Sequence, residues 1–527
     1  MALSSSFIRG TAARPVFAVA DDNDAAYGEA TAVIVPVFSA GAADNDNSIE
    51  LAAPVMWPEE ASVAVWNALS AVGATGKSGE VTVIPAPAEV PGAVSVVVAA
   101  GLGAGEGSGE DAAESAAAPE DGPVEVDPEQ LRRAAGAAIQ ALKGHEVVAS
   151  TLGSFGMGAA VEGTVLGSYS YRGLKTDEET NPAPATVVFV GTEADRADFD
   201  KAAAIAEGVL LARDFVNAPS SHLYPDSYAR TAAEFAAAAG LEVEVYTESE
   251  LAEQGFGGIM GVGQGSSRKP RLLRLVHNPQ DASKHVALVG KGITFDTGGI
   301  SLKPGAGMED MISDMGGSAA MIAAIVTAAK LNLPVKVTAT IPMAENMPDG
   351  EAYRPGDVLT QYGGTTVEIL NTDAEGRLIL ADGIARASED NPDYLLETAT
   401  LTGAQLVALG ARTTGVMGTA GFRERVAEIG SAVGEPSWAM PFPEELKDAV
   451  KSPVADLRNV TGSRFGGMLV AGIFLDHFVG EGIKWAHLDV AGPAFNTQGA
   501  FGYTPKRATG RPVRHIVAVM EDIALHG

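Results

Sequence analysis

Short apolar runs alternate with helical patterns between about residue 200 and residue 490, and this alternation restricts the possible folds more than any other feature. The apolar runs include Leu272–His277, His285–Val289, Val335–Ile341, Thr366–Ile369 and Tyr394–Glu397. Helical patterns occur at Ser318–Leu331, Arg377–Ala387 and Leu469–Val479. The alternation predicts an α/β domain with a mainly parallel sheet that is covered by helices. In such sheets, ligands bind beyond the carboxyl ends of the strands.

The first third of the chain predicts a second, smaller α/β domain. Its apolar runs, at Ala32–Phe38, Val81–Ile84, Val94–Ala100 and Thr186–Val190, have strand length, and Pro128–Lys143 has a helical pattern. A chain of 527 residues exceeds a single ordinary hydrophobic core. We therefore predict domains at residues 1–195 and 196–527. An acidic stretch at about 106–127 has almost no large apolar side chains, which predicts a flexible surface loop.

Composition excludes several classes of function. The formal net charge is −31, from 67 acidic and 36 basic residues, and this disfavours binding to nucleic acid or to an anionic membrane. The chain has no cysteine, which excludes disulfides, thiolate metal sites and a cysteine nucleophile. The sequence has neither a long apolar run typical of a spanning helix nor an N-terminal secretory pattern, so we expect a cytoplasmic protein.

Charged residues gather in three segments that follow strand-like runs or precede helices. The first, Val289–Pro304, is rich in glycine and contains Lys291, Asp296 and Lys303. The second, Met308–Gly317, contains Asp314 just before an alanine-rich helical pattern. The third, Ile369–Leu378, contains Asp373, Glu375 and Arg377. Asp373 and Glu375 are two positions apart, so in extended backbone their side chains would point the same way.

These segments predict a metal site. Carboxylate oxygens without cysteine suit Mg²⁺, Mn²⁺ or Zn²⁺. Four carboxylates in one site would repel one another unless cations compensated them, and the number is sufficient for a pair of ions. Any single aspartate is more often a turn residue or a helix cap, and any single lysine is more often solvated. The metal interpretation depends on the set, because all three segments carry the same kind of ligand.

The same segments resemble a known family. Asn371-Thr-Asp-Ala-Glu-Gly-Arg-Leu378 is similar to the signature octapeptide of the leucyl aminopeptidases, the cytosol aminopeptidase family. Val289-Gly-Lys-Gly-Ile-Thr-Phe-Asp-Thr-Gly-Gly299 and Met308-Glu-Asp-Met-Ile-Ser-Asp-Met-Gly-Gly317 resemble two further elements of that family, at matching spacings. The resemblance covers residues 200 to 515 and is much weaker before residue 195. It implies a metal-dependent exopeptidase that releases leucine and other, mainly apolar, residues from the N-termini of peptides.

The resemblance also implies a role for each matching residue. Two divalent ions, Mn²⁺ or Zn²⁺ or Mg²⁺, would be held by Lys291, Asp296, Asp314, Asp373 and Glu375. Lys303 would stabilise the developing oxyanion, and Arg377 would hold a bicarbonate that acts as general base. The implied substrate-binding residues are Lys303, Met311, Asn371, Thr400, Leu401 and Gly403. A lysine nitrogen binds a metal only when it is deprotonated, so Lys291 would need a depressed pKa.

The resemblance further implies an N-terminal domain similar to a macro domain, and a homo-hexamer. Two alternatives to the aminopeptidase remain. One is a dipeptidase of the cysteinylglycine type, which the same site could support. The other is a non-catalytic DNA-binding or scaffold protein on the same fold, although the charge of −31 argues against DNA as a partner.

Overall fold

The computed structural model describes residues 10–19, 27–39, 49–52, 57–103, 125–177, 179–463 and 465–527. The chain divides into two compact units. The larger unit contains Gly208–Thr497 and Lys506–Gly527, and the smaller contains Gly10–Glu207 and Gln498–Pro505. The division falls inside helix α5 (Arg196–Asn217), and the domain boundary near residue 195 stays a prediction. Most of the acidic stretch 106–127 lies outside the described residues.

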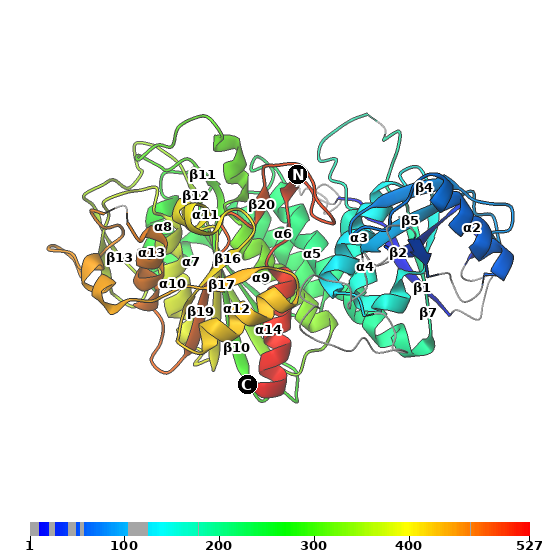
Figure 1. Cartoon of the computed structure of the whole chain (residues 1–527). Helices are drawn as coiled ribbons and strands as arrows, with labels where there is room; N and C mark the ends of the chain where they lie inside the picture. Colours follow the sequence, from blue (N-terminus) through cyan, green and yellow to red (C-terminus); the bar gives the residue numbers. More distant parts are fainter. Residues whose placement is uncertain are drawn as a thin grey trace. The chain divides into compact units, whose positions relative to one another are not determined.

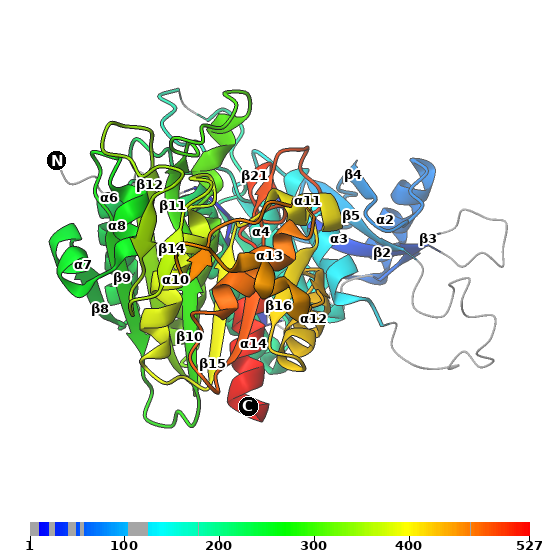
Figure 2. The same cartoon turned by 90° about the vertical axis from the view of Figure 1, so that its left-hand side faces the viewer.

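The larger unit is built on a nine-stranded sheet with helices on both faces (Figures 1 and 2). The strand order is β17-β16-β19-β15-β10-β12-β9-β8, and β11 pairs with β12. The strands are β8 (Glu242–Tyr246), β9 (Arg271–His277), β10 (His285–Gly290), β11 (Gly292–Asp296), β12 (Lys336–Asn346), β15 (Tyr394–Ala399), β16 (Thr414–Gly418), β17 (Ser437–Ala439) and β19 (Lys484–Asp489). The prediction of a mainly parallel, helix-covered sheet is confirmed.

Four central strands, β12, β10, β15 and β19, are mutually parallel, so their carboxyl ends lie at one edge of the sheet. Val289 of β10, for example, pairs with Thr340 on one side and with Glu397 on the other. Strands β10 and β15 are buried along their whole length, as expected of strands covered on both faces, and most of their residues are apolar. The residues that follow their carboxyl ends occupy the edge where ligands bind in this class of sheet.

Helices α9 (Gly316–Lys330) and α14 (Val513–His526) pack together, and α9 covers β10, β12 and β15. A core cluster on the other face joins Val289, Leu395 and Trp485 to α8 (Gly257–Gly263), α10 (Gly376–Ser388) and α13 (Gly467–Asp476). In the described part of the chain, one helical run, Met308–Lys330, is apolar and long enough to cross a membrane. It is 89% buried inside the protein over that window, as expected of a core helix.

The remaining elements of this unit surround the sheet. They are α6 (Pro225–Ala238), α7 (Glu248–Gln254), α11 (Gly403–Leu409), α12 (Phe422–Ala432) and the two-stranded pair β20 (Phe495–Asn496) and β21 (Arg507–Ala508). A separate three-stranded sheet is formed by β13 (Val358–Thr360), β14 (Thr366–Glu368) and β18 (Leu457–Arg458). The run Thr366–Ile369, grouped with the main-sheet strands in the sequence analysis, therefore contributes to this smaller sheet.

The glycine-rich segment between Val289 and Lys303 contains strand β11. Strand β12 continues beyond Thr340, the last of its residues that pairs with β10, and ends at Asn346. Strand β11 pairs with this extension of β12, through the parallel pairs Gly292–Met343 and Asp296–Asn346. This pairing brings Asp296 beside the carboxyl end of β12.

The smaller unit contains a seven-stranded sheet of order β1-β7-β6-β2-β5-β4, with β3 paired to β2. Its strands are β1 (Arg14–Val19), β2 (Ala32–Ser39), β3 (Ile49–Leu51), β4 (Val81–Pro85), β5 (Val96–Gly103), β6 (Val147–Ser150) and β7 (Thr186–Gly191). Its helices are α2 (Glu59–Ala71), α3 (Pro128–Gln140) and α4 (Met157–Gly167). The smaller α/β domain is thus confirmed, whereas its similarity to a macro domain stays a prediction.

Candidate active site

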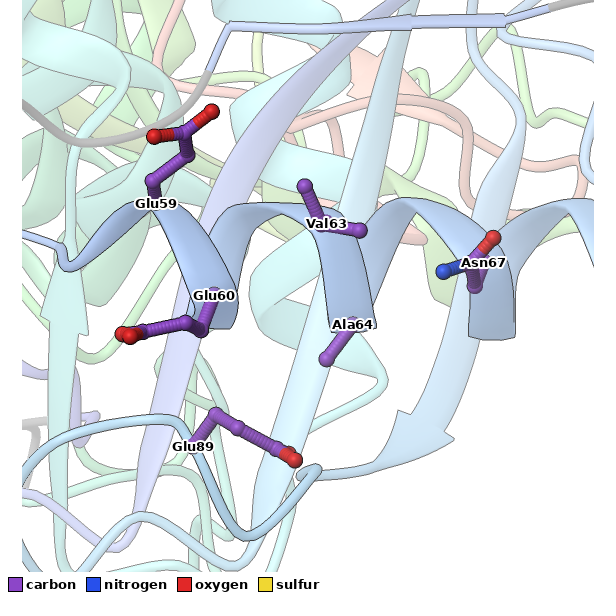
Figure 3. A pocket seen from close by; sticks show the side chains of 6 residues that line it. All are labelled: Glu59, Glu60, Val63, Ala64, Asn67 and Glu89. Atoms are coloured by element: carbon purple, nitrogen blue, oxygen red, sulfur yellow. The ribbon is translucent and has the colours of Figure 1, made fainter.

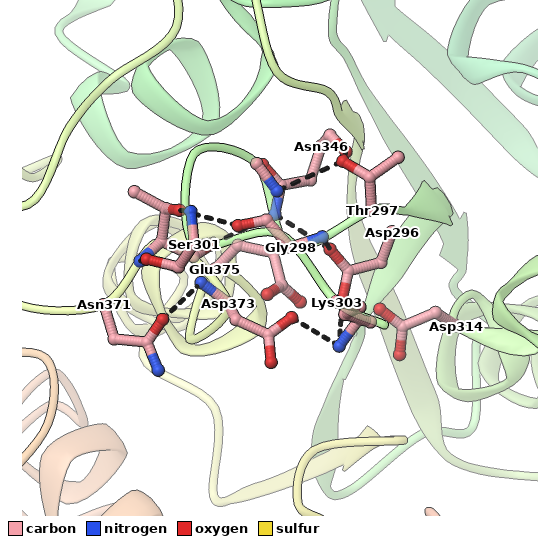
Figure 4. A network of polar contacts seen from close by, with 12 residues as sticks. Asp296, Thr297, Gly298, Ser301, Lys303, Asp314, Asn346, Asn371, Asp373 and Glu375 are labelled. Atoms are coloured by element: carbon pink, nitrogen blue, oxygen red, sulfur yellow. Dashed lines mark hydrogen bonds and ion pairs between the residues drawn. The ribbon is translucent and has the colours of Figure 1, made fainter. Parts of the chain in front are cut away.

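A cluster of buried charges lies at the carboxyl edge of the main sheet (Figure 4). Lys291 follows β10 directly, and Asp296 ends β11. Asp314 follows the short 3₁₀ helix Met308–Ser313, just before α9. Asp373 and Glu375 precede the first turn of α10. Elements far apart in the sequence therefore bring all the predicted metal-binding side chains to one place.

The deepest part of the cluster joins Lys291 to two carboxylates. Its Nζ lies 2.7 Å from Oδ1 of Asp314 and 2.9 Å from Oε1 of Glu375. The hydroxyl of Thr400 donates to the same oxygen of Asp314 at 2.7 Å. Lys291, Asp314 and Glu375 are 3%, 6% and 1% exposed, so water does not screen their interactions effectively. In this arrangement the lysine ammonium is the counterion of both acids.

Lys303 joins the other two carboxylates. Its Nζ lies 2.8 Å from Oδ2 of Asp296 and also forms an ion pair with Oδ1 of Asp373. The backbone returns to this position through a tight turn at Gly298, whose φ is +85°. A Cβ there would lie 2.5 Å from the carbonyl oxygen of Ser301 and 2.8 Å from Asp373 Oδ1, so the turn requires glycine.

Asp373 and Glu375 share the cluster, but their backbone is not extended. Residues 372 and 373 form a turn, in which the backbone N–H of Asp373 donates to Oδ1 of Asn371 at 2.9 Å. Glu375 already has helical backbone angles, φ −78° and ψ −36°. The two carboxylates do lie in one cluster, but the expected reason, an extended backbone, is wrong. The turn and the start of α10 bring the two carboxylates together.

Most of the predicted substrate-binding residues surround a hollow of about 230 Å³ over this cluster. Its lining combines the charged residues with Met311, Thr400, Leu401, Gly403 and Leu406. Asn371 does not line it, and instead its side chain supports the turn at Asp373. Arg377 lines one wall, where its guanidinium donates to the backbone oxygen of Asn459 at 2.7 Å.

Burial has shifted the acid–base properties of the cluster. It raises the pKa of Glu375 to about 8, and the neighbouring Asp296 acts in the same direction. Burial also raises the pKa of Asp314 to about 6, although Lys291 opposes this shift. Burial acts to lower the pKa of Lys291, but Asp314, Glu375 and Asp296 outweigh it and the pKa rises. The depressed pKa expected for Lys291 is therefore not present while these protein charges alone surround it.

The donor set fits a bound divalent cation. Asp296, Asp314 and Glu375 each offer a carboxylate oxygen, and these oxygens lie within 4.8 Å of one another. Among the described residues, Oδ2 of Asp314 and Oε2 of Glu375 are buried without a hydrogen-bond partner. A buried carboxylate oxygen without a partner is costly, and a cation would satisfy it. Hard oxygen ligands of this kind suit Mg²⁺, Mn²⁺ or Zn²⁺.

Several polar residues that hold this cluster together are absent from the prediction. Asn346, Thr372, Tyr353 and Asn459 hydrogen-bond the loops that carry the charged side chains. Asn346 could have been found by the same reasoning as the others, because it stands at the carboxyl end of a central strand. The predicted strand stopped at Ile341, five positions short of it.

A second hollow lies on the smaller unit, beside α2 (Figure 3). It is lined by Glu59, Glu60, Val63, Ala64, Asn67 and Glu89. As far as the structure describes the chain, this lining contains neither a basic side chain nor a buried polar atom without a partner. A solvated acidic surface of this kind gives no reason to expect a ligand.

The chain matches models of one protein family over both units. Residues 210–517 match the catalytic domain of the cytosol aminopeptidase family, and residues 34–178 match its N-terminal domain. A probable cytosol aminopeptidase of Corynebacterium diphtheriae is 56% identical over 497 residues, covering 94% of each chain. Its counterpart in Corynebacterium glutamicum is 63% identical over 401 residues, covering 76% of this chain and 80% of that protein.

A solved structure agrees with these matches. The bottromycin maturation enzyme BotP in complex with Mn superposes with a TM-score of 0.80 at 33% sequence identity. The superposition covers 94% of this chain and all of that one. The similarity therefore extends over both units, including the carboxyl edge of the main sheet that carries the charged cluster.

Proposed function

The chain belongs to the cytosol aminopeptidase family, and from this premise we propose that it is a metal-dependent aminopeptidase that releases leucine and similar apolar residues from peptide N-termini. Family membership makes it a peptidase, and specifically an exopeptidase. The observation that carries the metal dependence is the buried carboxylate cluster. Within the described part of the chain, Asp314 Oδ2 and Glu375 Oε2 are buried without a hydrogen-bond partner.

The proposed metal ligands are Lys291, Asp296, Asp314, Asp373 and Glu375, and the number of ions is two. The similar enzyme BotP was solved in complex with Mn, which supports a divalent metal here. When bound, such ions lower the pKa of water and polarise a peptide carbonyl. Lys291 would take part as a neutral amine, so the ammonium that now pairs with Asp314 and Glu375 would have to lose a proton.

Lys303 and Arg377 are the proposed catalytic side chains of the protein itself. The ammonium of Lys303 is held between Asp296 and Asp373 at the wall of the hollow, where it can stabilise negative charge on a peptide oxygen. Arg377 is anchored by the backbone oxygen of Asn459. Its Nε is buried without a hydrogen-bond partner in the described structure, which supports the proposed bicarbonate there.

The specificity follows from the lining of the hollow. A free α-amine offers a nitrogen lone pair that a metal bound to the carboxylates of the hollow could accept, whereas the nitrogen of an acetylated N-terminus does not. Met311, Leu401 and Leu406 supply an apolar wall, which favours an apolar side chain at the first residue. A volume of about 230 Å³ suits one residue of a peptide better than a long segment.

We also propose a cytoplasmic location and a homo-hexamer. The first is supported by the names of the relatives and by the absence of cysteine from the sequence. The second comes only from the family resemblance. Neither nucleic acid nor a membrane is proposed as a partner, since the net charge of −31 repels polyanions.

The test is hydrolysis of leucine p-nitroanilide and of a Leu-peptide with a free or an acetylated N-terminus. Each is assayed with Mn²⁺ or Zn²⁺, after chelation, and beside a Glu375→Ala control. We expect release of leucine from the free peptide only, dependent on metal and lost in the control. Cleavage of the acetylated peptide, or activity that survives complete chelation, would overturn the proposal.

The second candidate function is a dipeptidase of the cysteinylglycine type, and the same assay distinguishes it. A dipeptidase would cleave Cys-Gly and leave longer peptides intact, because it needs the carboxylate of the second residue. An aminopeptidase cleaves dipeptides and longer peptides alike. The hollow favours the aminopeptidase, because the basic side chains that line it, among the described residues, are Lys291, Lys303 and Arg377, within the charged cluster itself.

A further inference from the structure

Asn346 is a buried polar residue at the edge of the site that the proposed mechanism does not use. It is the last residue of β12, one of the four central parallel strands, and its exposed fraction is 0%. It pairs in the sheet with Asp296 of β11. A neutral amide is thus placed beside the charged cluster, in a position where a charged side chain would change the electrostatic balance.

The side chain of Asn346 connects two of the charged segments (Figure 4). Its Nδ2 donates to Oδ1 of Asp296 at 2.8 Å and to the backbone oxygen of Thr372 at 3.1 Å. Its backbone oxygen accepts hydrogen bonds from the N–H and the hydroxyl of Thr297, at 3.1 and 2.8 Å. Asn346 therefore hydrogen-bonds both the end of β11 and the turn formed by residues 372 and 373.

This connection restricts the Asp296 carboxylate. Oδ1 also accepts the backbone N–H of Gly298 at 2.8 Å, and Oδ2 is paired with Lys303. The N–H of Gly298 and Asn346 Nδ2 together leave the carboxylate little freedom to rotate. Gly298 connects to the Asp373 segment through its backbone, whose carbonyl accepts the hydroxyl of Thr372 at 2.6 Å. Asn346 makes the connection through a single side-chain nitrogen, because the Nδ2 that donates to Asp296 also donates to Thr372.

The space around Asn346 is closely packed. A Cβ added to Gly299 would lie 2.8 Å from its Oδ1 and 3.1 Å from the hydroxyl of Thr372. The hydroxyl of Tyr353 donates at 2.8 Å to the backbone oxygen of Thr372, the oxygen that Asn346 Nδ2 also contacts. Both donors to this carbonyl are buried, so the orientation of the amide is determined by its surroundings.

We propose that Asn346 is a positioning residue that fixes the Asp296 carboxylate relative to the Asn371–Arg377 segment and thereby sets the affinity of the site for divalent cations. The inference rests on the proposed metal-dependent function. Asn346 does not line the hollow, so it acts through Asp296. Outer ligand contacts of this kind typically change metal affinity or activity by about 10- to 100-fold.

Asn459 provides a matched control. It is also a buried asparagine, 1% exposed, and its Nδ2 donates to the backbone oxygen of Asn371 at 2.6 Å. Its side chain thus supports the same segment from the other end, without a hydrogen bond to Asp296. Asn459→Ala removes a buried amide and its hydrogen bonds to this segment, so it reports what such a loss does to metal binding when no bond to Asp296 is involved.

The experiment compares the full-length wild type with Asn346→Ala and Asn459→Ala. Bound Mn²⁺ is measured directly by titration, with the electron paramagnetic resonance signal of the free ion as readout. The kcat and KM for leucine p-nitroanilide are then measured at saturating Mn²⁺. We expect Asn346→Ala to weaken Mn²⁺ binding by about tenfold or more. We expect Asn459→Ala to change it by less than about threefold.

Asn346→Ser covers the case in which Asn346→Ala does not fold. Its hydroxyl keeps a polar group in the space, but it is too short to bridge Asp296 and Thr372. Mn²⁺ affinity within twofold of the wild type in a folded Asn346 variant would overturn the positioning role, as would equal losses in the Asn346 and Asn459 variants. Failure of the proposed function is distinguishable, because the wild type itself would then bind no Mn²⁺ or release no leucine.

Discussion

Lys303 is held by two carboxylates but remains partly accessible from the hollow, with a side chain that is 23% exposed. We expect Lys303→Met to lower kcat for leucine p-nitroanilide by about 10²- to 10³-fold, because it removes the positive charge beside the developing oxyanion. Lys303→Arg keeps the charge and should lose less. The measurement is steady-state kinetics at saturating Mn²⁺. A normal kcat in a Lys303→Met variant that binds Mn²⁺ would contradict the proposed role.

His285 gives a prediction about stability that is independent of the site. Burial, with help from Lys336, lowers its pKa from 6.5 to about 4, while Asp390 and Asp393 oppose the shift. The folded state therefore binds fewer protons than the unfolded state between these pH values. The stability that neutral His285 contributes is present above about pH 6.5 and is lost as the pH falls towards 4.

A variant that cannot titrate isolates this effect. Nε2 of His285 and the hydroxyl of Thr338 lie 3.0 Å apart, and Gln retains the ability to hydrogen-bond there. We expect the Tm of the wild type to exceed that of His285→Gln most at pH 7.5, and the difference to shrink as the pH falls to 4.5. A difference that stays constant over this range would show that His285 does not titrate as described.

At the scale of the elements, Asp382 of α10 joins this helix to α8. Its carboxylate accepts the backbone N–H of Ile259 and the backbone N–H of Tyr362, both at 2.8 Å. Ile259 lies in the first turn of α8, where N–H groups have no partner within the helix. Asp382 is fully buried, so no water can replace it easily.

We expect Asp382→Ala to destabilise the protein by about 2–6 kcal/mol, because one buried and one partly buried donor lose their acceptor at about 1–3 kcal/mol each. Chemical denaturation followed by circular dichroism measures the change. Asp357→Ala is the control, since Asp357 pairs with the largely exposed Arg354 and surface pairs contribute about 0–1 kcal/mol. Equal losses in the two variants would contradict the role of Asp382.

The elements also show what the sequence could and could not predict. Central strands such as β10 and β15 were predicted to within two residues, because strands buried on both faces are continuous apolar runs. Strand β11 was missed, since it contains two polar residues and exists only because β12 offers it an unpaired edge. The extension of β12 to Asn346 was missed for the same reason, because its last residues are polar and stabilised by tertiary contacts.

The charged residues of the cluster were predicted from the sequence, whereas the polar residues that hydrogen-bond their loops were not. Lys291, Asp296, Asp314, Asp373 and Glu375 follow or precede predicted elements, so the shared edge of a parallel sheet was enough to place them together. Their geometry was not predictable, because the turn at Asp373 depends on Asn371 and on bonds from distant residues. Asn459 lies 82 positions after Arg377, and nothing local in the sequence connects the two.

At the scale of the whole molecule, the cluster adds to a large excess of negative charge. The chain carries a net charge of −31, and the site places four carboxylates against two lysines and Arg377. Burial makes this local excess of negative charge energetically costly, and the cost is seen in the raised pKa of Glu375, about 8. A site arranged for a cation therefore destabilises the fold when no cation is bound, and each bound ion should return that stability.

Metal removal tests this directly. We expect chelation to lower the Tm of the wild type and Mn²⁺ to restore it, since an ion at about 100 times its Kd adds about 2.7 kcal/mol. Glu375→Gln removes the ionisable carboxyl while keeping the shape. Its metal-free form should be at least as stable as the metal-free wild type, but Mn²⁺ should raise its Tm much less. If Mn²⁺ raised both Tm values equally, the ion would be binding elsewhere, and the assignment of Glu375 as a ligand would be wrong.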